Sequence, residues 1–177
     1  MIKRGLYIGR FNPPHLGHIE AIKSILNESD LNQLIIGIGS AQESFTIRNP
    51  FTAGERYEML YSALKEVVSL EKLMIVPLLD LNDNNQWISY LKSLLPKFGT
   101  IFSNNPLVIL LTKKDKDLQI APVKLFNRDR YSSTNIRKKI ILDDNDWRNL
   151  IPKAIYEKII EINGIERIKL LSTNDTE

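Results

Sequence analysis

The chain has 177 residues, of which 43% are hydrophobic and 25% charged, a composition typical of one globular domain. It contains no cysteine, which excludes disulfides, thiolate metal sites and thiol catalysis, and its apolar runs are far shorter than the roughly 20 residues that span a membrane. The net charge of +3 suits an anionic ligand, but Lys and Arg are interleaved with Asp and Glu, which disfavours nucleic acid as a partner. We therefore expect a cytoplasmic protein with no signal peptide, no membrane segment and no nucleic-acid partner.

Apolar runs typical of buried strands alternate with stretches of helical periodicity through the first two thirds of the chain. The strand-like runs are 5–9, 34–39, 72–79, 100–104 and 118–123. Apolar residues at helical spacing lie between them, at 16–28, 52–67 and 87–95. No repeat or linker divides the chain, so we expect a single domain over residues 1–171 and a polar tail at 172–177.

The helix predicted over 52–67 has the clearest local signals. Thr52, followed three residues later by Glu55, is a capping-box pattern. Its apolar stripe is made of Met59, Leu60, Ala63, Leu64 and Val67. From Thr134 onward the pattern predicts helices only, with Pro152 in a first turn and Gly164 at a helix end.

Continuous apolar strands separated by helices predict a parallel sheet with both faces covered. The expected fold class is α/β, a doubly wound, Rossmann-like parallel sheet of about five strands with a helical C-terminal cap. Ligands of such sheets bind beyond the carboxyl ends of the strands, near the point where the strand order reverses. The stretch GRFNPPHLGH (9–18) directly follows the first predicted strand and therefore lies at such an end.

His15 and His18 are the only two histidines, and both lie in this loop. They are open to three interpretations: polar or satisfied structural residues, metal ligands completed by carboxylates such as Glu20, or donors to phosphate groups. A helix that begins around Gly17–His18 offers free N–H groups and a positive dipole end to an anion. Gly9 and Gly17 permit close approach of the backbone, and Arg10 adds a cation, so phosphate chemistry is the favoured interpretation.

Two short motifs resemble the signatures of the nucleotidyltransferase superfamily. HLGH after GRFNPP resembles its H-x-G-H motif, and YSSTNIR (131–137), about 120 residues later, resembles its S-x-T-x-I-R motif. More narrowly, the chain resembles the archaeal-type nicotinamide-nucleotide adenylyltransferases through IGSAQESFTIRNPFTAGER, DLNDNNQW, SNNP, RDRYSSTNIRKK, DWRNLIP and INGIERIK. Two departures are Asn12, where the archaeal type more often has Gln, and Ser133, where it often has Gly.

The resemblance implies an enzyme that joins ATP and nicotinamide mononucleotide (NMN) to give NAD and pyrophosphate, in NAD biosynthesis. The NMN phosphate would attack the α-phosphorus directly, with catalysis by alignment and charge stabilisation. By resemblance, the catalytic residues are Arg10, His15, His18 and Arg137. The implied ATP-binding residues are Gly9, Arg10, Phe11, His15, Gly17, His18, Arg48, Tyr131, Ser132, Thr134 and Arg137. Two alternatives stay open: Arg48 as a solvated loop cation and Thr134 as a plain helix cap.

The expected NMN-binding residues are Ser40, Asp80, Asn84, Trp87 and Asn105. Trp87 would stack on the cationic nicotinamide ring, and Asn84 would pair with its carboxamide. The alternatives are a core aromatic for Trp87 and turn formation for Asp80 and Asn84. Mg²⁺, or another divalent ion, would be carried mainly by the triphosphate, and the sequence indicates no metal ligands. The resemblance also implies a homo-oligomer.

Three other functions compete with this one. A sister adenylyltransferase would use the same motifs on nicotinate mononucleotide, phosphopantetheine or FMN. A regulatory module would bind the nucleotide without turnover, although the combination of two histidines and two arginines argues against mere binding. A metal-dependent hydrolase would need no acceptor and would be inhibited by a chelator.

Overall fold

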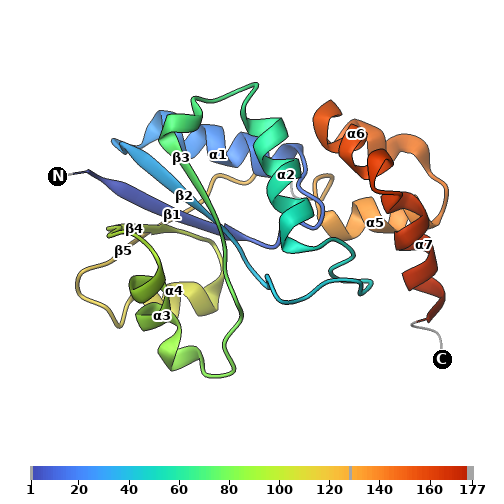
Figure 1. Cartoon of the computed structure of the whole chain (residues 1–177). Coiled ribbons are helices and arrows are strands. Elements are labelled where there is room, and N and C mark those ends of the chain that lie inside the picture. Colours follow the sequence, from blue (N-terminus) through green and yellow to red (C-terminus); the bar gives the residue numbers. More distant parts are fainter. Residues whose placement is uncertain (1, 128, 175–177) are drawn as a thin grey trace.

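A five-stranded parallel sheet forms the centre of the molecule (Figure 1). The computed structural model describes residues 2–127 and 129–174. The strands are β1 (Arg4–Gly9), β2 (Gln33–Ile38), β3 (Leu73–Pro77), β4 (Thr100–Phe102) and β5 (Gln119–Ala121), in the order β3-β2-β1-β4-β5. All neighbouring strands are parallel, and each strand lies within or next to a predicted apolar run.

Helices cover both faces of the sheet. The helices on one face are α1 (Leu16–Glu28) and α2 (Ala53–Leu64), and those on the other are α3 (Trp87–Leu94) and α4 (Pro106–Thr112) (Figure 1). The described residues also form the short 3₁₀ segments η1 (Leu70–Lys72), η2 (Asn84–Gln86) and η3 (Asn145–Leu150). The chain leaves β1 first toward β2 and β3, and later returns to the other side of β1, so the predicted doubly wound sheet is confirmed.

The side chains of the strands pack into two apolar layers, one on each face of the sheet. Leu34, Ile36 and Ile38 of β2 pack with the helices on the α1 side, whereas Ile35 points to the opposite layer with Leu6 of β1. This alternation follows from the two-residue period of a strand. A strand covered on both faces is apolar at nearly every position, which is the reason that these runs stand out in the sequence.

In the part of the chain that the structure describes, the C-terminal cap consists of α5 (Ser133–Ile141), α6 (Lys153–Glu161) and α7 (Gly164–Asn174). They lie beyond the carboxyl ends of β1 and β2, next to α2 (Figure 1). The predicted helical cap is therefore confirmed, and it borders the edge of the sheet where ligands are expected. Residues 172–174 of the expected tail belong to α7, and 175–177 lie outside the described residues.

Two local predictions near helix ends were wrong. Helix α2 ends at Leu64, so Val67 lies past the apolar stripe and is 46% exposed. Pro152 is the N-cap of α6 and not a residue of its first turn.

Gly164 begins α7 and does not end a helix, contrary to the prediction. The left-handed backbone position between α6 and α7 belongs to Asn163, with φ of 54°, because asparagine tolerates this conformation. Gly164 is needed for close packing, since a Cβ there would lie 2.8 Å from the Phe51 ring.

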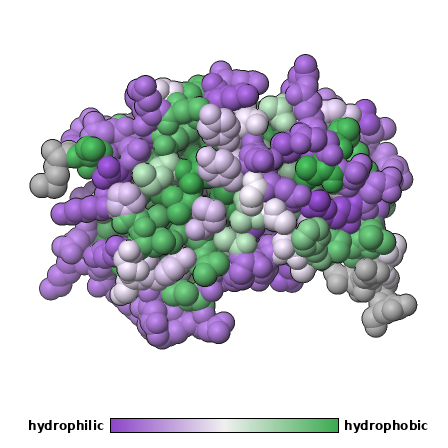
Figure 2. Space-filling view, in the orientation of Figure 1, coloured by the Kyte–Doolittle hydropathy of each residue, from purple (hydrophilic) through white to green (hydrophobic). Residues whose placement is uncertain are grey.

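Hydrophobic residues gather over the middle of the molecular face shown in Figure 2, and hydrophilic residues follow its margins.

Helix α4 was not predicted, because its side chains are almost all apolar and show no periodicity. Within residues 2–127 and 129–174, no helix is long and apolar enough to cross a membrane.

Candidate active site

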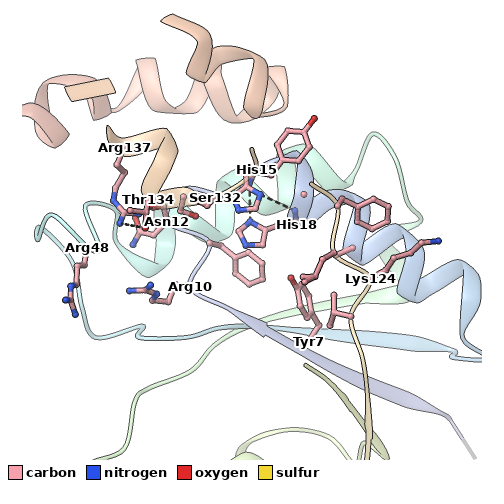
Figure 3. Close-up of a pocket in the computed structure, with 18 residues that line it drawn as sticks. Tyr7, Arg10, Asn12, His15, His18, Arg48, Lys124, Ser132, Thr134 and Arg137 are labelled. Carbon is pink, nitrogen blue, oxygen red and sulfur yellow. Dashed lines mark hydrogen bonds between the residues drawn. The ribbon is translucent and has the colours of Figure 1, made fainter. Parts of the chain in front are cut away.

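A cavity of about 340 Å³ lies beyond the carboxyl end of β1, at the point where the strand order reverses. Its walls come from β1, the loop to α1, the start of α1, the loop between β2 and α2, the loop after β5 and the start of α5 (Figure 3). Ten of the predicted ATP-binding residues line it: Arg10, Phe11, His15, Gly17, His18, Arg48, Tyr131, Ser132, Thr134 and Arg137. The tertiary structure thus joins the two sequence motifs in one pocket. Gly9, the remaining predicted residue, ends β1 and packs under the Phe11 ring.

The two histidines form a reciprocal cap at the start of α1. His15 Nδ1 accepts the backbone N–H of His18 at 3.3 Å, and His18 Nδ1 accepts the backbone N–H of His15 at 3.2 Å. Their rings stack with 3.6 Å between centroids. Because each Nδ1 is an acceptor, each Nε2 carries the proton of the neutral ring and is a donor.

Burial keeps both imidazoles neutral at physiological pH. It lowers the pKa of His15 to about 4. It also holds the pKa of His18 well below the ordinary value, and the charge of a protonated His15 lowers it further. The pair therefore offers neutral N–H donors, and the negative charge of a bound polyphosphate would favour the protonated forms.

Arg137 connects the second motif to the first. Its Nη1 donates to the carbonyl oxygen of Asn12 at 2.7 Å, and its side chain is only 7% exposed. Burial, with a contribution from the nearby charge of Arg10, lowers the pKa of Arg137 to about 10, so it stays charged at neutral pH. Arg10 and Arg48 are exposed and lie on the same side of the pocket (Figure 3).

The serines of the second motif have structural partners. Ser132 is the N-cap of α5, since its Oγ accepts the Asn135 N–H at 3.0 Å. The alternative of a plain helix cap for Thr134 is therefore wrong, and Thr134 is exposed in the first turn. Ser133 Oγ donates to the Pro13 carbonyl oxygen at 2.8 Å. Ser133, which replaces the usual Gly, therefore adds a direct bond between the two motifs.

Asn12 also acts through the backbone of a neighbouring loop. Its Oδ1 accepts the Phe51 N–H at 3.1 Å, and its Nδ2 donates to the Phe51 carbonyl oxygen at 3.2 Å. The side chain is 1% exposed. Asn12 therefore anchors the first motif and leaves its own carbonyl to Arg137.

The other end of the pocket is largely apolar and was not predicted. It contains Tyr7, Ala21, Val123, Lys124, Leu125 and Phe126. Burial raises the pKa of Tyr7 to about 12, so the phenol stays protonated. The only local signal in the sequence was the end of a strand near 123. A strand end does not reveal which of the following side chains turn toward a ligand.

The predicted NMN-binding residues do not line this pocket. Ser40 follows β2 and Asp80 follows β3, and the Ser40 N–H donates to Asp80 Oδ1 at 3.3 Å. Asn105 follows β4 and caps α4, accepting the Leu107 N–H at 2.9 Å. These three residues share one edge of the sheet, because the carboxyl ends of parallel strands lie together.

Asn84 and Trp87 lie farther along, at the start of α3. Asn84 is exposed in η2, whereas Trp87 is half-buried and packs against the apolar layer that contains Leu91. The core interpretation of Trp87 therefore has direct support, and its side chain retains an exposed part.

A protein-built metal site has no support in the part of the chain that the structure describes. No group of three or more His, Cys, Asp or Glu side chains there is arranged to hold a metal ion. The pocket offers imidazole and guanidinium groups, which suit an anion.

Comparisons with known proteins agree with this geometry. Residues 6–139, which include both motifs, match the family model described as Cytidylyltransferase-like. The chain is 46% identical over 176 residues to a nicotinamide-nucleotide adenylyltransferase of Saccharolobus solfataricus, covering 98% of this chain and 99% of that protein. It is 43% identical over 175 residues to a nicotinamide-nucleotide adenylyltransferase of Thermococcus kodakarensis, covering 98% of this chain and 91% of the relative.

A solved structure with a similar fold is a bifunctional NMN adenylyltransferase/ADP ribose pyrophosphatase of Francisella tularensis, complexed with AMP and a Mn ion. The TM-score is 0.73 and the identity 21%, and the match covers 99% of this chain. The chain spans 53% of that larger protein. The likeness supports the doubly wound fold.

Proposed function

The chain belongs to the Cytidylyltransferase-like family and, within it, to the nicotinamide-nucleotide adenylyltransferases, and we propose how its pocket serves that activity. The resemblance read from the motifs is confirmed by relatives that match nearly the whole chain. We propose that the protein transfers the adenylyl group of ATP to NMN, giving NAD and pyrophosphate. The observation that carries this proposal is the convergence of Arg10, His15, His18 and Arg137 on one cavity.

The reaction is a direct displacement at phosphorus. An oxygen of the NMN 5′-phosphate forms a bond to the α-phosphorus of ATP, and the bond between this phosphorus and the bridging oxygen to the β-phosphate breaks. Pyrophosphate leaves with the electron pair. The attacking phosphate is already an anion at neutral pH, so the chain needs no strong general base, and alignment with charge stabilisation supplies the catalysis.

The polar end of the pocket binds the triphosphate. The Nε2–H groups of His15 and His18 donate to phosphate oxygens, with His18 at the transferring group. Arg137 pairs with the β- and γ-phosphates through the part of its guanidinium not used on Asn12. Arg10 and Arg48 approach from the exposed side. Neutral donors held in place by backbone N–H groups need no reorganisation as charge develops.

The apolar end of the pocket takes the adenine ring. Tyr7 and Phe126 supply aromatic surface there, and Val123 and Leu125 supply aliphatic surface. A flat base buries best between such side chains, while the polar groups hold the phosphates.

NMN approaches from the neighbouring strand ends. Ser40 and Asp80 hold the acceptor nucleotide at the ends of β2 and β3, and Asn84, Trp87 and Asn105 complete its site. The exposed part of the Trp87 ring stacks on nicotinamide, in addition to its role in the core.

Mg²⁺ enters bound to the triphosphate, as part of the substrate. The described residues offer no carboxylate cage, so phosphate oxygens and water would supply its ligands. We further propose that the protein works in the cytoplasm as a homo-oligomer, in agreement with the resemblance.

The test is a panel of acceptors. Purified protein with ATP and Mg²⁺ is mixed separately with NMN, nicotinate mononucleotide, phosphopantetheine or FMN. Products are identified by mass spectrometry, and pyrophosphate release is followed in parallel. NAD as the dominant product supports the proposal.

Adenylylation of another acceptor would keep the phosphate chemistry and overturn the assignment of the NMN residues. ATP binding with no product from any acceptor would overturn the catalytic proposal and leave a nucleotide-binding module.

A further inference from the structure

Arg56 is a fully buried cation in the first turns of α2, with 0% exposure. It does not line the nucleotide pocket. A guanidinium group carries five N–H donors, and in Arg56 all five have a partner. Every partner is a backbone carbonyl oxygen, belonging to Arg10, Gly39, Ser40, Glu43 and Thr52.

Three of the five partners lie just past the ends of two neighbouring strands. Nη1 donates to the Arg10 carbonyl oxygen at 2.9 Å, directly after β1, and to the Gly39 carbonyl oxygen at 2.8 Å, directly after β2. Nη2 donates to the Ser40 carbonyl oxygen at 3.0 Å. One rigid planar group therefore spans the gap between the segment with Arg10 and the segment with Ser40.

Burial lowers the pKa of Arg56, and the charges of Asp80 and Glu43 act in the opposite direction. A buried charge costs stability unless hydrogen bonds compensate for it, and an apolar side chain would avoid this cost. All five donors of the Arg56 guanidinium bond to backbone carbonyl oxygens, which indicates that this side chain holds the two loops in a fixed arrangement.

We propose that Arg56 is a positioning residue for adenylyl transfer, which sets the separation between the triphosphate side at the end of β1 and the acceptor side at the end of β2. This inference rests on the proposed function. In-line displacement requires the acceptor oxygen and the α-phosphorus to be aligned, and small misplacements are costly. Arg56 touches neither substrate, and it acts through the backbone of Arg10, Gly39 and Ser40.

The variant Arg56→Lys keeps the charge but has only three donors, so at least two of the five carbonyl groups lose their partner. We expect kcat to fall by at least about tenfold, with KM for ATP and for NMN within about threefold of wild type. The matched control is Leu64→Ala, a fully buried residue at the other end of α2 that does not line the pocket. The Leu64→Ala substitution should lower the melting temperature of the protein without touching either loop. We expect this variant to keep the wild-type kcat when it is assayed below its own melting temperature.

Equal kcat in Arg56→Lys and wild type would overturn the proposal. A common loss of kcat in Arg56→Lys and Leu64→Ala would also overturn it, because Arg56 would then act only through stability. If the wild-type protein gives no NAD, the proposed function fails. The role of Arg56 in ordering the strand ends is then tested by amide hydrogen exchange.

Hydrogen exchange of the wild-type protein supplies that measurement, and it needs no variant to fold. The segment that Arg56 clamps is residues 39–43, and its first amides are hydrogen-bonded. The Gly39 N–H donates to the Gly9 carbonyl oxygen, and the Ala41 N–H donates to the Leu78 carbonyl oxygen. The Ser40 N–H donates to Asp80 Oδ1. We expect residues 39–43 to exchange more slowly than residues 44–48 of the same loop. Equally fast exchange in both segments would show that the clamp does not order the strand end, and would overturn the proposal.

Discussion

The imidazole rings of His15 and His18 stack at 3.6 Å between centroids, and each ring accepts the backbone N–H of the other residue. The same Nδ1 atoms thus cap α1 and set both neutral tautomers. The Nε2–H groups remain as the donors for a ligand, so the helix start and the phosphate site depend on one hydrogen-bonded unit.

His18 variants separate these two roles. In His18→Asn, the side-chain oxygen can still accept the His15 N–H, but the Nε2 donor is lost. We expect kcat to fall on the order of 10²–10³-fold, as for the loss of an oxyanion donor, with a modest change in ATP affinity and a melting temperature near wild type. His18→Ala removes both roles and should lower the melting temperature as well. Turnover close to wild type in both variants would refute the assigned role of His18.

Arg137→Lys removes the planar fork but keeps the charge. One ammonium group cannot hold the Asn12 carbonyl oxygen in the same geometry and still pair with two phosphate oxygens. We expect kcat/KM for ATP to fall roughly 10- to 100-fold, the loss of one charged hydrogen bond. The matched control is Arg148→Lys, because Arg148 is an exposed arginine of η3, and this variant should leave kcat/KM for ATP unchanged. Single-turnover rates equal to wild type would show that Arg137 does not contact the reacting phosphates.

The buried histidines predict a pH dependence of stability. The pKa of His15 falls from 6.5 to about 4 on folding, so the fold favours the neutral ring. The contribution of the neutral His15 ring to the free energy of unfolding is fully present above pH 6.5 and is lost as the pH falls toward 4. The loss is at most on the order of 3 kcal/mol.

Chemical denaturation at several pH values should therefore show a falling free energy of unfolding through that window. His15→Asn, which keeps a cap acceptor and does not titrate, should show a shallower fall. The same slope in both proteins would mean that His15 is not desolvated in the fold.

Arg167 of α7 anchors the loop that carries Arg48. Its guanidinium forms a two-bond pair with Glu55, at 2.7 and 2.9 Å, and lies 5.0 Å from the centre of the Phe45 ring. Burial alone would raise the pKa of Glu55, but hydrogen bonds from Arg167 and Thr52 lower it.

Arg167→Met should therefore lower the free energy of unfolding by on the order of 2 kcal/mol and raise KM for ATP, with kcat retained. Lys169→Met is the control on the same helix, since its partner Asp143 is exposed, and it should change neither quantity. An unchanged KM in Arg167→Met would show that the position of Arg48 does not depend on the C-terminal cap.

Asn84→Ala tests the acceptor site. Asn84 is exposed at the start of η2, so the substitution should leave the melting temperature unchanged. If its amide binds the nicotinamide carboxamide, KM for NMN should rise about 5- to 10-fold with KM for ATP constant. An unchanged KM for NMN would favour the turn-forming interpretation of this residue.

The strands, and every helix that covers the sheet except α4, could be predicted from the sequence, because burial on both faces requires continuous apolar runs and helix caps depend on neighbouring residues. The capping box of Thr52 and Glu55 was visible for this reason. Both phosphate motifs were also visible, since their residues are close together along the chain. The boundaries near Val67 and Gly164 were wrong. At Gly164 the boundary depends on close packing against the ring of the distant Phe51.

How the two motifs meet could not be predicted from the sequence. Arg137 bonds to the Asn12 carbonyl oxygen across 125 positions, and Ser133 bonds to the Pro13 carbonyl oxygen across 120. The five carbonyl partners of Arg56 gave no sign in the sequence either. Every residue carries a backbone carbonyl group, so the choice among them depends on where the folded chain brings each one.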